Sequence, residues 1–280
     1  MPGIIYIVGT PIGNLSDFSP RAIQTLREVD FIAAEDTRVT LKLLNHFDIR
    51  KPLVSYHEHN LRERGEAIIQ RVLDGENVAV VSDAGMPCVS DPGEDIVRLA
   101  AEADIQTIVI PGPSAAISAL CISGLSTSRF SFEGFLSTNR KNRREHLQSL
   151  IGNTHTLIFY EAPHKLLDTL KDMASTFGAD RRISLCREMT KIHEQVFRTT
   201  LEKAIQYYSE NTPKGEFVLI LEGAQKPVEP EVTFEQAVEE AAQLVESGVR
   251  VADAAKQVSA HTPFKKSEIY SALISISREE

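Results

Sequence analysis

Residues 4–14 read IIYIVGTPIGN, a short apolar run that ends in a loop rich in Gly and Pro. Such a run is typical of a buried strand, and a helical spacing of apolar residues follows it over 19–29. The same alternation continues along the chain, with strands predicted over 31–34, 53–56, 78–81 and 107–110 and helices over 37–47, 61–73 and 94–103. Strands that alternate with helices favour a mostly parallel sheet covered on both faces.

The second half of the chain has fewer helices between its strands. The pattern predicts strands over 130–136, 156–160, 183–186, 196–200 and 217–221, and helices over 144–150 and 165–177. Strands that follow one another without a helix favour a mixed sheet. After a Pro-containing linker, helices are predicted over 234–245, 251–258 and 267–276.

The sequence therefore predicts two α/β domains, the first with a mostly parallel sheet and the second with a mixed sheet, followed by a small C-terminal helical module. A length of 280 residues fits about two domains at roughly 150 residues each. We expect the domains to cover 1–123, 124–225 and 226–280, because a Gly/Ser/Thr-rich connection lies at 123–129.

Composition limits the class of protein. The net charge of −9 argues against a protein that coats nucleic acid over its whole surface. Cys88, Cys121 and Cys186 are odd in number and far apart, so neither a disulfide framework nor a C-x-x-C zinc site can be built from them within one chain. No apolar run approaches the ~20 residues that span a bilayer, and the first basic residue is Arg21. We expect a soluble, reduced, cytoplasmic protein that does not bind membranes.

Three loops of the first domain share a composition of Gly and Pro. They follow predicted strands and cover 9–14, 82–93 and 111–115. Gly lets a ligand lie against the backbone, and Pro fixes the shape of the loop. Any one of these loops is explained better as a tight turn, but carboxyl ends of parallel strands share one edge of the sheet. Three such loops at one edge favour a ligand site.

The same loops speak against a dinucleotide. The first reads Gly9-x-x-x-Gly13 rather than G-x-G-x-x-G, and Pro11 lacks an amide hydrogen. No cluster of Arg or Lys accompanies the loops, so a highly phosphorylated ligand fits poorly. Asp83 and Asp91 favour a neutral or cationic ligand that carries hydroxyl groups.

These loops and several other segments resemble the tetrapyrrole methylase-like family of class III S-adenosylmethionine-dependent methyltransferases. The matching segments occur in the family's order and lie at 7–15, 34–38, 55–60, 82–87, 111–115, 159–164, 187–191 and 215–217. The tetrapyrrole enzymes have G-x-G-P in the first loop, where this chain has Gly-Thr-Pro-Ile at 9–12. That departure favours the branch of the family that acts on RNA.

The resemblance implies a homodimer that methylates a cytidine ribose 2′-hydroxyl in 16S rRNA of the small ribosomal subunit. Two alternatives stay open: a C-methyltransferase that acts on a precorrin, and a non-catalytic relative that binds RNA or a ligand. S-adenosylmethionine would lie in a cleft between the two α/β domains. The implied cofactor contacts are Ile12, Asp83, Gly85, Met86, Ser114, Ala115, Phe159, Tyr160, Met189 and Glu216. Among these, Phe159 and Met189 can pack on the adenine, and Asp83 can accept from a hydroxyl or an ammonium group.

The loops after the second and third strands carry the candidate catalytic residues. Asp36 or His57 could accept the proton of the hydroxyl group, and Arg38 could stabilise negative charge. Alternatively, Asp36 caps the helix that begins at Thr37 and pairs with Arg38. His57 and His59 invite a metal hypothesis, but no clear third ligand accompanies them, so we expect no metal.

The densest basic run of the chain lies at 138–144. Its cations are Arg140, Lys141, Arg143 and Arg144. We expect an exposed loop that contacts RNA phosphates without reading sequence. The alternative is the solvated start of a helix, although cations are unfavourable at a helix N-terminus.

Overall fold

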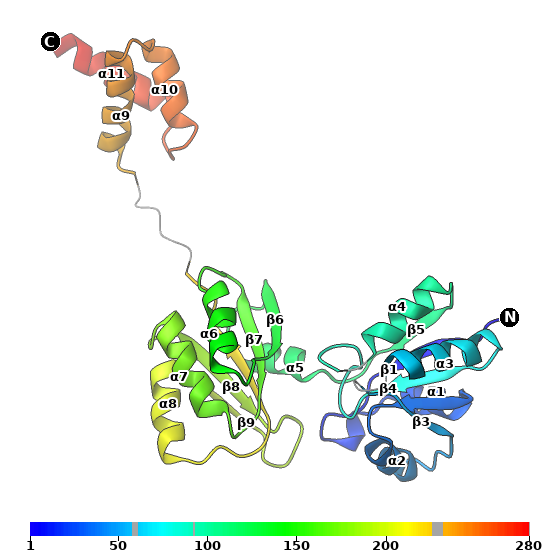
Figure 1. The fold of residues 1–280 in the computed structure, drawn as a ribbon. Coiled ribbons are helices and arrows are strands. Elements are labelled where there is room, and N and C mark those ends of the chain that lie inside the picture. The colour runs from blue at the N-terminus through cyan, green and yellow to red at the C-terminus, as the bar shows by residue number, and fades with distance from the viewer. Residues whose placement is uncertain (58–60, 92, 226–231, 280) are drawn as a thin grey trace. The chain divides into compact units, whose positions relative to one another are not determined.

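The computed structural model describes residues 1–57, 61–91, 93–225 and 232–279. The chain divides into two units, Met1–Ala224 and Gln225–Glu280. The first unit holds two five-stranded sheets with their helices, and the second holds three helices (Figure 1). The predicted class, two α/β domains and a helical module, is confirmed. The exact domain limits of 1–123, 124–225 and 226–280 stay predictions.

The first sheet is parallel throughout and has the strand order β3-β2-β4-β1-β5. Its strands are β1 (Ile5–Val8), β2 (Phe31–Ala34), β3 (Leu53–Ser55), β4 (Val78–Val81) and β5 (Thr107–Ile110). The helices between them are α1 (Pro20–Glu28), α2 (Thr37–His46), α3 (Leu61–Leu73) and α4 (Glu94–Glu102), with a short 3-10 helix η1 (Leu15–Asp17). Separate apolar clusters cover the two faces of this sheet. Because β4, β1 and β5 are neighbours, the three Gly/Pro loops leave the sheet side by side.

The second sheet is mixed, as predicted, with the order β6-β7-β10-β8-β9 and one parallel pair, β6 with β7. Its strands are β6 (Phe130–Phe135), β7 (Thr156–Glu161), β8 (Arg182–Arg187), β9 (Gln195–Thr200) and β10 (Phe217–Leu221). Helices α6 (Arg140–Ser149), α7 (Leu166–Phe177) and α8 (Leu201–Glu210) pack on one face. Helix α5 (Ala115–Ile122) packs on the other face.

Three helices differ from the prediction. Helices α5 and α8 were not predicted. Helix α6 begins at Arg140, not at Arg144, and the Asn139 side chain caps it by accepting from the amides of Lys141 and Asn142. The basic run is therefore the first turn of a helix and not a loop, because a good N-cap residue precedes it.

The second unit consists of α9 (Phe234–Glu246), α10 (Val251–Ser259) and α11 (Lys266–Glu279). A capping box starts α9, in which the Thr233 hydroxyl accepts from the Gln236 amide and the Thr233 amide donates to the Gln236 side chain. The three helices enclose their own apolar cluster. In the described part of the chain, no helix has both the length and the apolar character that a bilayer crossing requires.

Candidate active site

The three Gly/Pro loops contact one another at the carboxyl edge of the first sheet. Thr10 and Gly85 form an antiparallel bridge, with N–O distances of 2.8 and 3.1 Å. A Cβ atom at Gly9 would lie 2.7 Å from the Gly112 Cα atom and 2.6 Å from the Met86 sulfur. That sulfur also accepts from the Gly112 amide at 3.3 Å. The loops approach so closely that only glycine fits at these positions.

The second sheet meets these loops through α5. Ile12 of the first loop and Ala115 at the start of α5 pack with Met189 and Tyr160 in one apolar cluster. The Tyr160 hydroxyl accepts from the Ala116 amide at 3.2 Å. Burial raises the pKa of Tyr160. The structure therefore brings together four of the predicted cofactor contacts. Two of them lie in the Gly/Pro loops of the first sheet, and two lie in or just after strands of the second sheet.

Phe159 does not join this group. Strand residues alternate between the faces of a sheet, so Phe159 points away from its neighbour Tyr160. Its side chain is fully buried in the core that α6, α7 and α8 cover. The expectation that Phe159 packs on an adenine is wrong for this structure, because the two adjacent aromatic residues cannot share one face.

Glu216 lies in a charged cluster beside the tip of the first loop. The Lys191 ammonium contacts carboxylate oxygens of Glu216 at 2.9 Å and of Glu188 at 3.0 Å. A Cβ atom at Gly13 would lie 2.6 Å from the Lys191 Cγ atom. Sequence reasoning did not assign Lys191 to the site. The signal available in the sequence was that Lys191 lies in 187–191, one of the segments that resemble the family.

Asp83 stands next to the loop that follows β2. Its carboxylate accepts from the Asp36 amide at 3.1 Å, and its own amide donates to the Glu35 carboxylate at 3.3 Å. Partial burial raises the pKa of Asp83, against the opposing effect of the Asp36 hydrogen bond. Burial raises the pKa of Asp91 as well, and the charge of Asp83 adds to that rise. This acidic edge suits a cationic ligand.

Asp36 and Arg38 form a pair at the start of α2. One Asp36 oxygen accepts from the Arg38 amide at 2.8 Å, and the other lies 2.7 Å from the Arg38 guanidinium. These hydrogen bonds hold the pKa of Asp36 at about 2. A carboxylate with so low a pKa is a weak general base. The structure thus favours the capping interpretation of Asp36.

His57 is half-buried after β3, and the rest of its motif, residues 58–60, lies outside the described residues. The second histidine of the metal hypothesis, His59, is among these. Within the described ranges, no group of three His, Cys, Asp or Glu side chains is placed to hold a metal ion.

A hollow of about 310 Å³ opens at the same edge of the sheet. The first loop, α2 and the Ser82–Asp83 turn line it, with Lys42 and His46 as its basic side chains. Its size is at the lower end of small-molecule sites. The hollow thus adjoins the first and second Gly/Pro loops and has room for part of a ligand.

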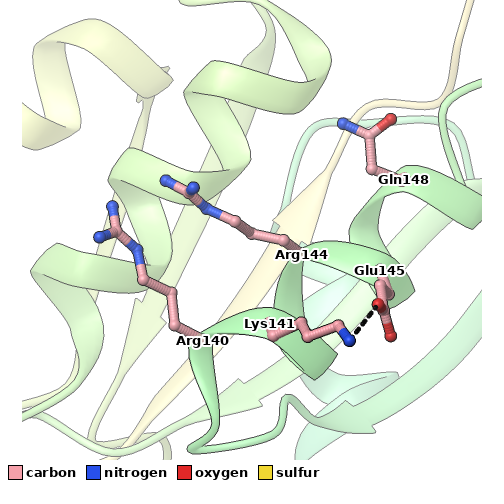
Figure 2. Close-up of a pocket in the computed structure, with 5 residues that line it drawn as sticks. All are labelled: Arg140, Lys141, Arg144, Glu145 and Gln148. Carbon is pink, nitrogen blue, oxygen red and sulfur yellow. Dashed lines mark ion pairs between the residues drawn. The ribbon is translucent and has the colours of Figure 1, made fainter.

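The basic residues of α6 line a second hollow, of about 620 Å³. We call it the arginine surface, and its residues are Arg140, Lys141, Arg144, Glu145 and Gln148 (Figure 2). Arg143 is not part of it. This side chain is buried against α7, where its guanidinium bonds Asp172. The expectation that Arg143 contacts RNA is therefore wrong, because the helix turns it inward.

Comparison with known proteins places these features in context. The model of the tetrapyrrole (corrin/porphyrin) methylases matches residues 4–205. Ribosomal RNA small subunit methyltransferase I of Synechocystis sp. is 48% identical over 268 residues, which cover 96% of each chain. The protein of that name from Halalkalibacterium halodurans is 49% identical and covers 96% of this chain and 93% of its own. The Thermotoga maritima protein of that name is 46% identical over 223 residues, which cover 80% of this chain and all of the relative.

Solved structures share the fold at lower identity. A uroporphyrin-III-C-methyltransferase from Thermus thermophilus superposes with a TM-score of 0.55 and 18% identity, over 78% of this chain and 94% of that one. A diphthine synthase gives a TM-score of 0.58 and 15% identity, over 78% and 89% of the chains. At such identities the likeness extends to the fold alone.

Proposed function

This chain belongs to the tetrapyrrole methylase family, and from that membership we propose that it methylates a cytidine ribose 2′-hydroxyl in 16S rRNA of the small ribosomal subunit. S-adenosylmethionine is the methyl donor. The observation that carries the proposal is the contact of three Gly/Pro loops beside an acidic edge. The names of relatives that match nearly the whole chain support an RNA acceptor.

The residues at this edge fit the donor. S-adenosylmethionine carries a sulfonium, an ammonium, a carboxylate and ribose hydroxyls. Asp83 can accept from a hydroxyl or from the ammonium group. The start of α5, which Ser114 caps, suits the carboxylate because helix N-termini favour anions. Ile12, Ala115 and Met189 offer apolar contact, and a Cβ atom at Gly85 would lie 3.4 Å from the Ile12 side chain.

The chemistry is an in-line displacement at the donor methyl group, so the protein must hold two reacting atoms in near-attack geometry. Asp36 is a weak base, and its role is to hold Arg38. Arg38 keeps its guanidinium exposed and can stabilise charge on the ribose oxygen or bind a phosphate. Of the three predicted catalytic residues, His57 is the chemical type suited to accept a proton near neutral pH.

The protein meets its acceptor in the cytoplasm, as a homodimer, with the arginine surface in contact with RNA phosphates. The free thiols of Cys88, Cys121 and Cys186 support a reducing compartment. The dimer rests on the family resemblance. Light scattering on the purified chain tests it, and a monomeric mass would contradict it.

Methyl transfer tests the function directly. Labelled S-adenosylmethionine is incubated with the full chain and naked 16S rRNA, with small subunits, or with precorrins, and the RNA is digested to nucleosides. We expect label in 2′-O-methylcytidine. Label in a base, or no label in RNA, would overturn the proposal. Label in the precorrin would support C-methylation of a tetrapyrrole instead.

A further inference from the structure

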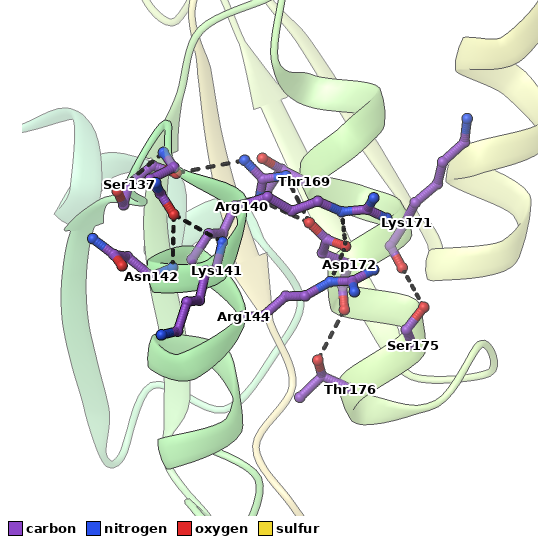
Figure 3. Close-up of polar contacts among 12 residues, drawn as sticks. Ser137, Arg140, Lys141, Asn142, Arg144, Thr169, Lys171, Asp172, Ser175 and Thr176 are labelled. Atoms are coloured by element: carbon purple, nitrogen blue, oxygen red, sulfur yellow. Dashed lines mark hydrogen bonds and ion pairs between the residues drawn. The ribbon is translucent and has the colours of Figure 1, made fainter.

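The basic residues of α6 fall into two sets, and a carboxylate on α7 separates them. Arg143 turns inward and donates through Nε and Nη2 to one oxygen of Asp172, at 2.9 and 2.6 Å. Arg144 donates through Nε to the other oxygen at 2.9 Å, and the Arg140 Nε lies 3.7 Å from that same oxygen. Figure 3 shows Asp172 at the centre of these contacts. One carboxylate therefore accepts hydrogen bonds from two guanidinium groups and lies in ion-pair range of a third.

Asp172 is itself almost completely enclosed, with 2% of its surface exposed. A buried charge is unfavourable unless it is paired. Burial raises the pKa of Asp172, but the hydrogen bonds from Arg143 and Arg144 outweigh this effect and lower the pKa overall. The carboxylate is therefore ionised at neutral pH and fixes the positions of its partners.

The outer two arginines keep most of their donors available. Arg140 and Arg144 lie one helical turn apart on one face of α6, with 69% and 49% of their side chains exposed. In Figure 2 both guanidinium groups point to the same side, while Lys141 points to Glu145. Within the described residues, the Nη atoms of Arg144 have no hydrogen-bond partner.

Charge arithmetic shows what Asp172 contributes. Two like charges at i and i+4 repel, and cations are unfavourable in the first turn of a helix. Asp172 offsets both effects and still leaves the region cationic, because four cations face only two carboxylates. Both exposed guanidinium groups lie on one side of α6, and each guanidinium can bind a phosphate through two N–H donors.

We propose that Asp172 is a positioning residue for RNA binding. It holds Arg140 and Arg144 so that both bind phosphates of the rRNA strand, and we call this pair of arginines the grip. This inference rests on the proposed function, since it takes RNA as the acceptor. Arg143 connects the grip to the core, whereas Lys141 pairs with Glu145 instead of Asp172.

The substitution Asp172→Asn separates positioning from net charge. It makes the arginine surface more positive by one charge, so binding governed by charge alone would become tighter. A positioned grip predicts the opposite, a loss of about tenfold in affinity for a labelled single-stranded fragment of 16S rRNA. Fluorescence anisotropy with the full chain measures this, and tighter binding would overturn the proposal.

Because Asp172 is buried, its substitution can also weaken the fold, so a matched pair on the surface of α6 provides a second test. Arg144→Ala and Lys141→Ala each remove one cation from the same turns. We expect Arg144→Ala to weaken binding about tenfold and to reduce the salt dependence by about 0.7 in slope, the value for one phosphate contact in a single strand. Lys141→Ala should cost only about twofold. Equal losses would overturn the grip.

The conservative variant Arg144→Lys completes the test. It keeps the charge and loses the Nε donor to Asp172, so the grip predicts a loss close to that of Arg144→Ala. Full rescue by Lys would overturn the proposal. A wild-type chain that methylates rRNA while these variants bind equally well contradicts only the grip. A wild-type chain that transfers no methyl group to RNA contradicts the proposed function.

Discussion

The Asp83 carboxylate accepts a hydrogen bond from the Asp36 amide, yet the pKa values of the two side chains shift in opposite directions. The Arg38 amide and guanidinium hold the pKa of Asp36 at about 2. For Asp83, partial burial outweighs the Asp36 hydrogen bond and the charge of Arg38, so its pKa is raised. A carboxylate kept in an unfavourable environment is typical of a functional site. Asp83 is therefore the residue of this edge whose loss should affect ligand binding most.

We predict that Asp83→Asn weakens S-adenosylmethionine binding about tenfold while slightly stabilising the chain at pH 7. The folded pKa of Asp83 is raised, so its ionised form destabilises the fold above that pKa, and the penalty disappears as the pH falls below about 4. The gain at pH 7 should be only about 1 °C in Tm, because the Asp83 carboxylate is only partly buried and water screens its charge. Calorimetry and thermal melts at pH 7 and pH 4 measure both effects.

Asp168→Asn is the matched control for that variant, since Asp168 is an exposed carboxylate in the first turn of α7. Its affinity for S-adenosylmethionine should equal that of the wild type. An Asp83→Asn chain with wild-type affinity would remove Asp83 from the cofactor site. A stability gain that persists unchanged at pH 4 would contradict the assigned origin of the pKa shift.

At the scale of elements, the contact between the first and third loops depends on two glycines that leave no room for a side chain. In Gly9→Ala the new Cβ atom would lie 2.7 Å from backbone of Gly112, and backbone cannot move aside cheaply. We predict a destabilisation of about 1–3 kcal/mol and a loss of S-adenosylmethionine binding of at least about tenfold. Urea denaturation and calorimetry measure the two effects.

Gly152→Ala is the control for this substitution, because a Cβ atom at Gly152 meets nothing within 4 Å. We expect that variant to unfold and to bind S-adenosylmethionine like the wild type. Wild-type binding by Gly9→Ala would show that the contact of the loops does not shape the cofactor site.

The sequence predicted the strands well because buried strands of a sheet are continuous apolar runs between Gly and Pro. It missed α5 because that helix is apolar except for Ser118 and has no amphipathic period. It missed α8 because Leu201 follows directly on the last residue of β9, with no loop between them. The two misses have different causes, because α5 lacks an amphipathic period, whereas α8 has one and an N-cap at Thr200 but continues directly from a strand.

The candidate site, like the fold, could be predicted from the sequence only in part. The sequence alone was enough to predict that the loops after β1, β4 and β5 lie at one edge, because parallel strands of one sheet have their carboxyl ends at the same edge. It could not decide that Phe159 faces the core or that Arg143 turns inward, because each depends on the register of one element against another. Asp172 was not singled out, although a carboxylate among the buried residues of α7 was a visible signal.

At the scale of the whole molecule, the two units have separate cores. The second unit has its own cluster of Ala, Val, Ile and Leu side chains within α9, α10 and α11. The Thermotoga maritima relative matches 223 residues of this chain over its full length, close to the length of the unit Met1–Ala224. The family model matches residues 4–205, which all lie in that unit.

We therefore predict that a chain truncated after Ala224 folds cooperatively and binds S-adenosylmethionine with an affinity within about twofold of the full chain. All the cofactor loops and both sheets lie in this unit, and its apolar clusters consist of its own residues. Calorimetry and thermal melts on both chains measure this. Loss of cofactor binding on truncation would mean that α9–α11 complete the site, and unchanged binding with reduced methyl transfer to small subunits would assign them to recognition of the particle.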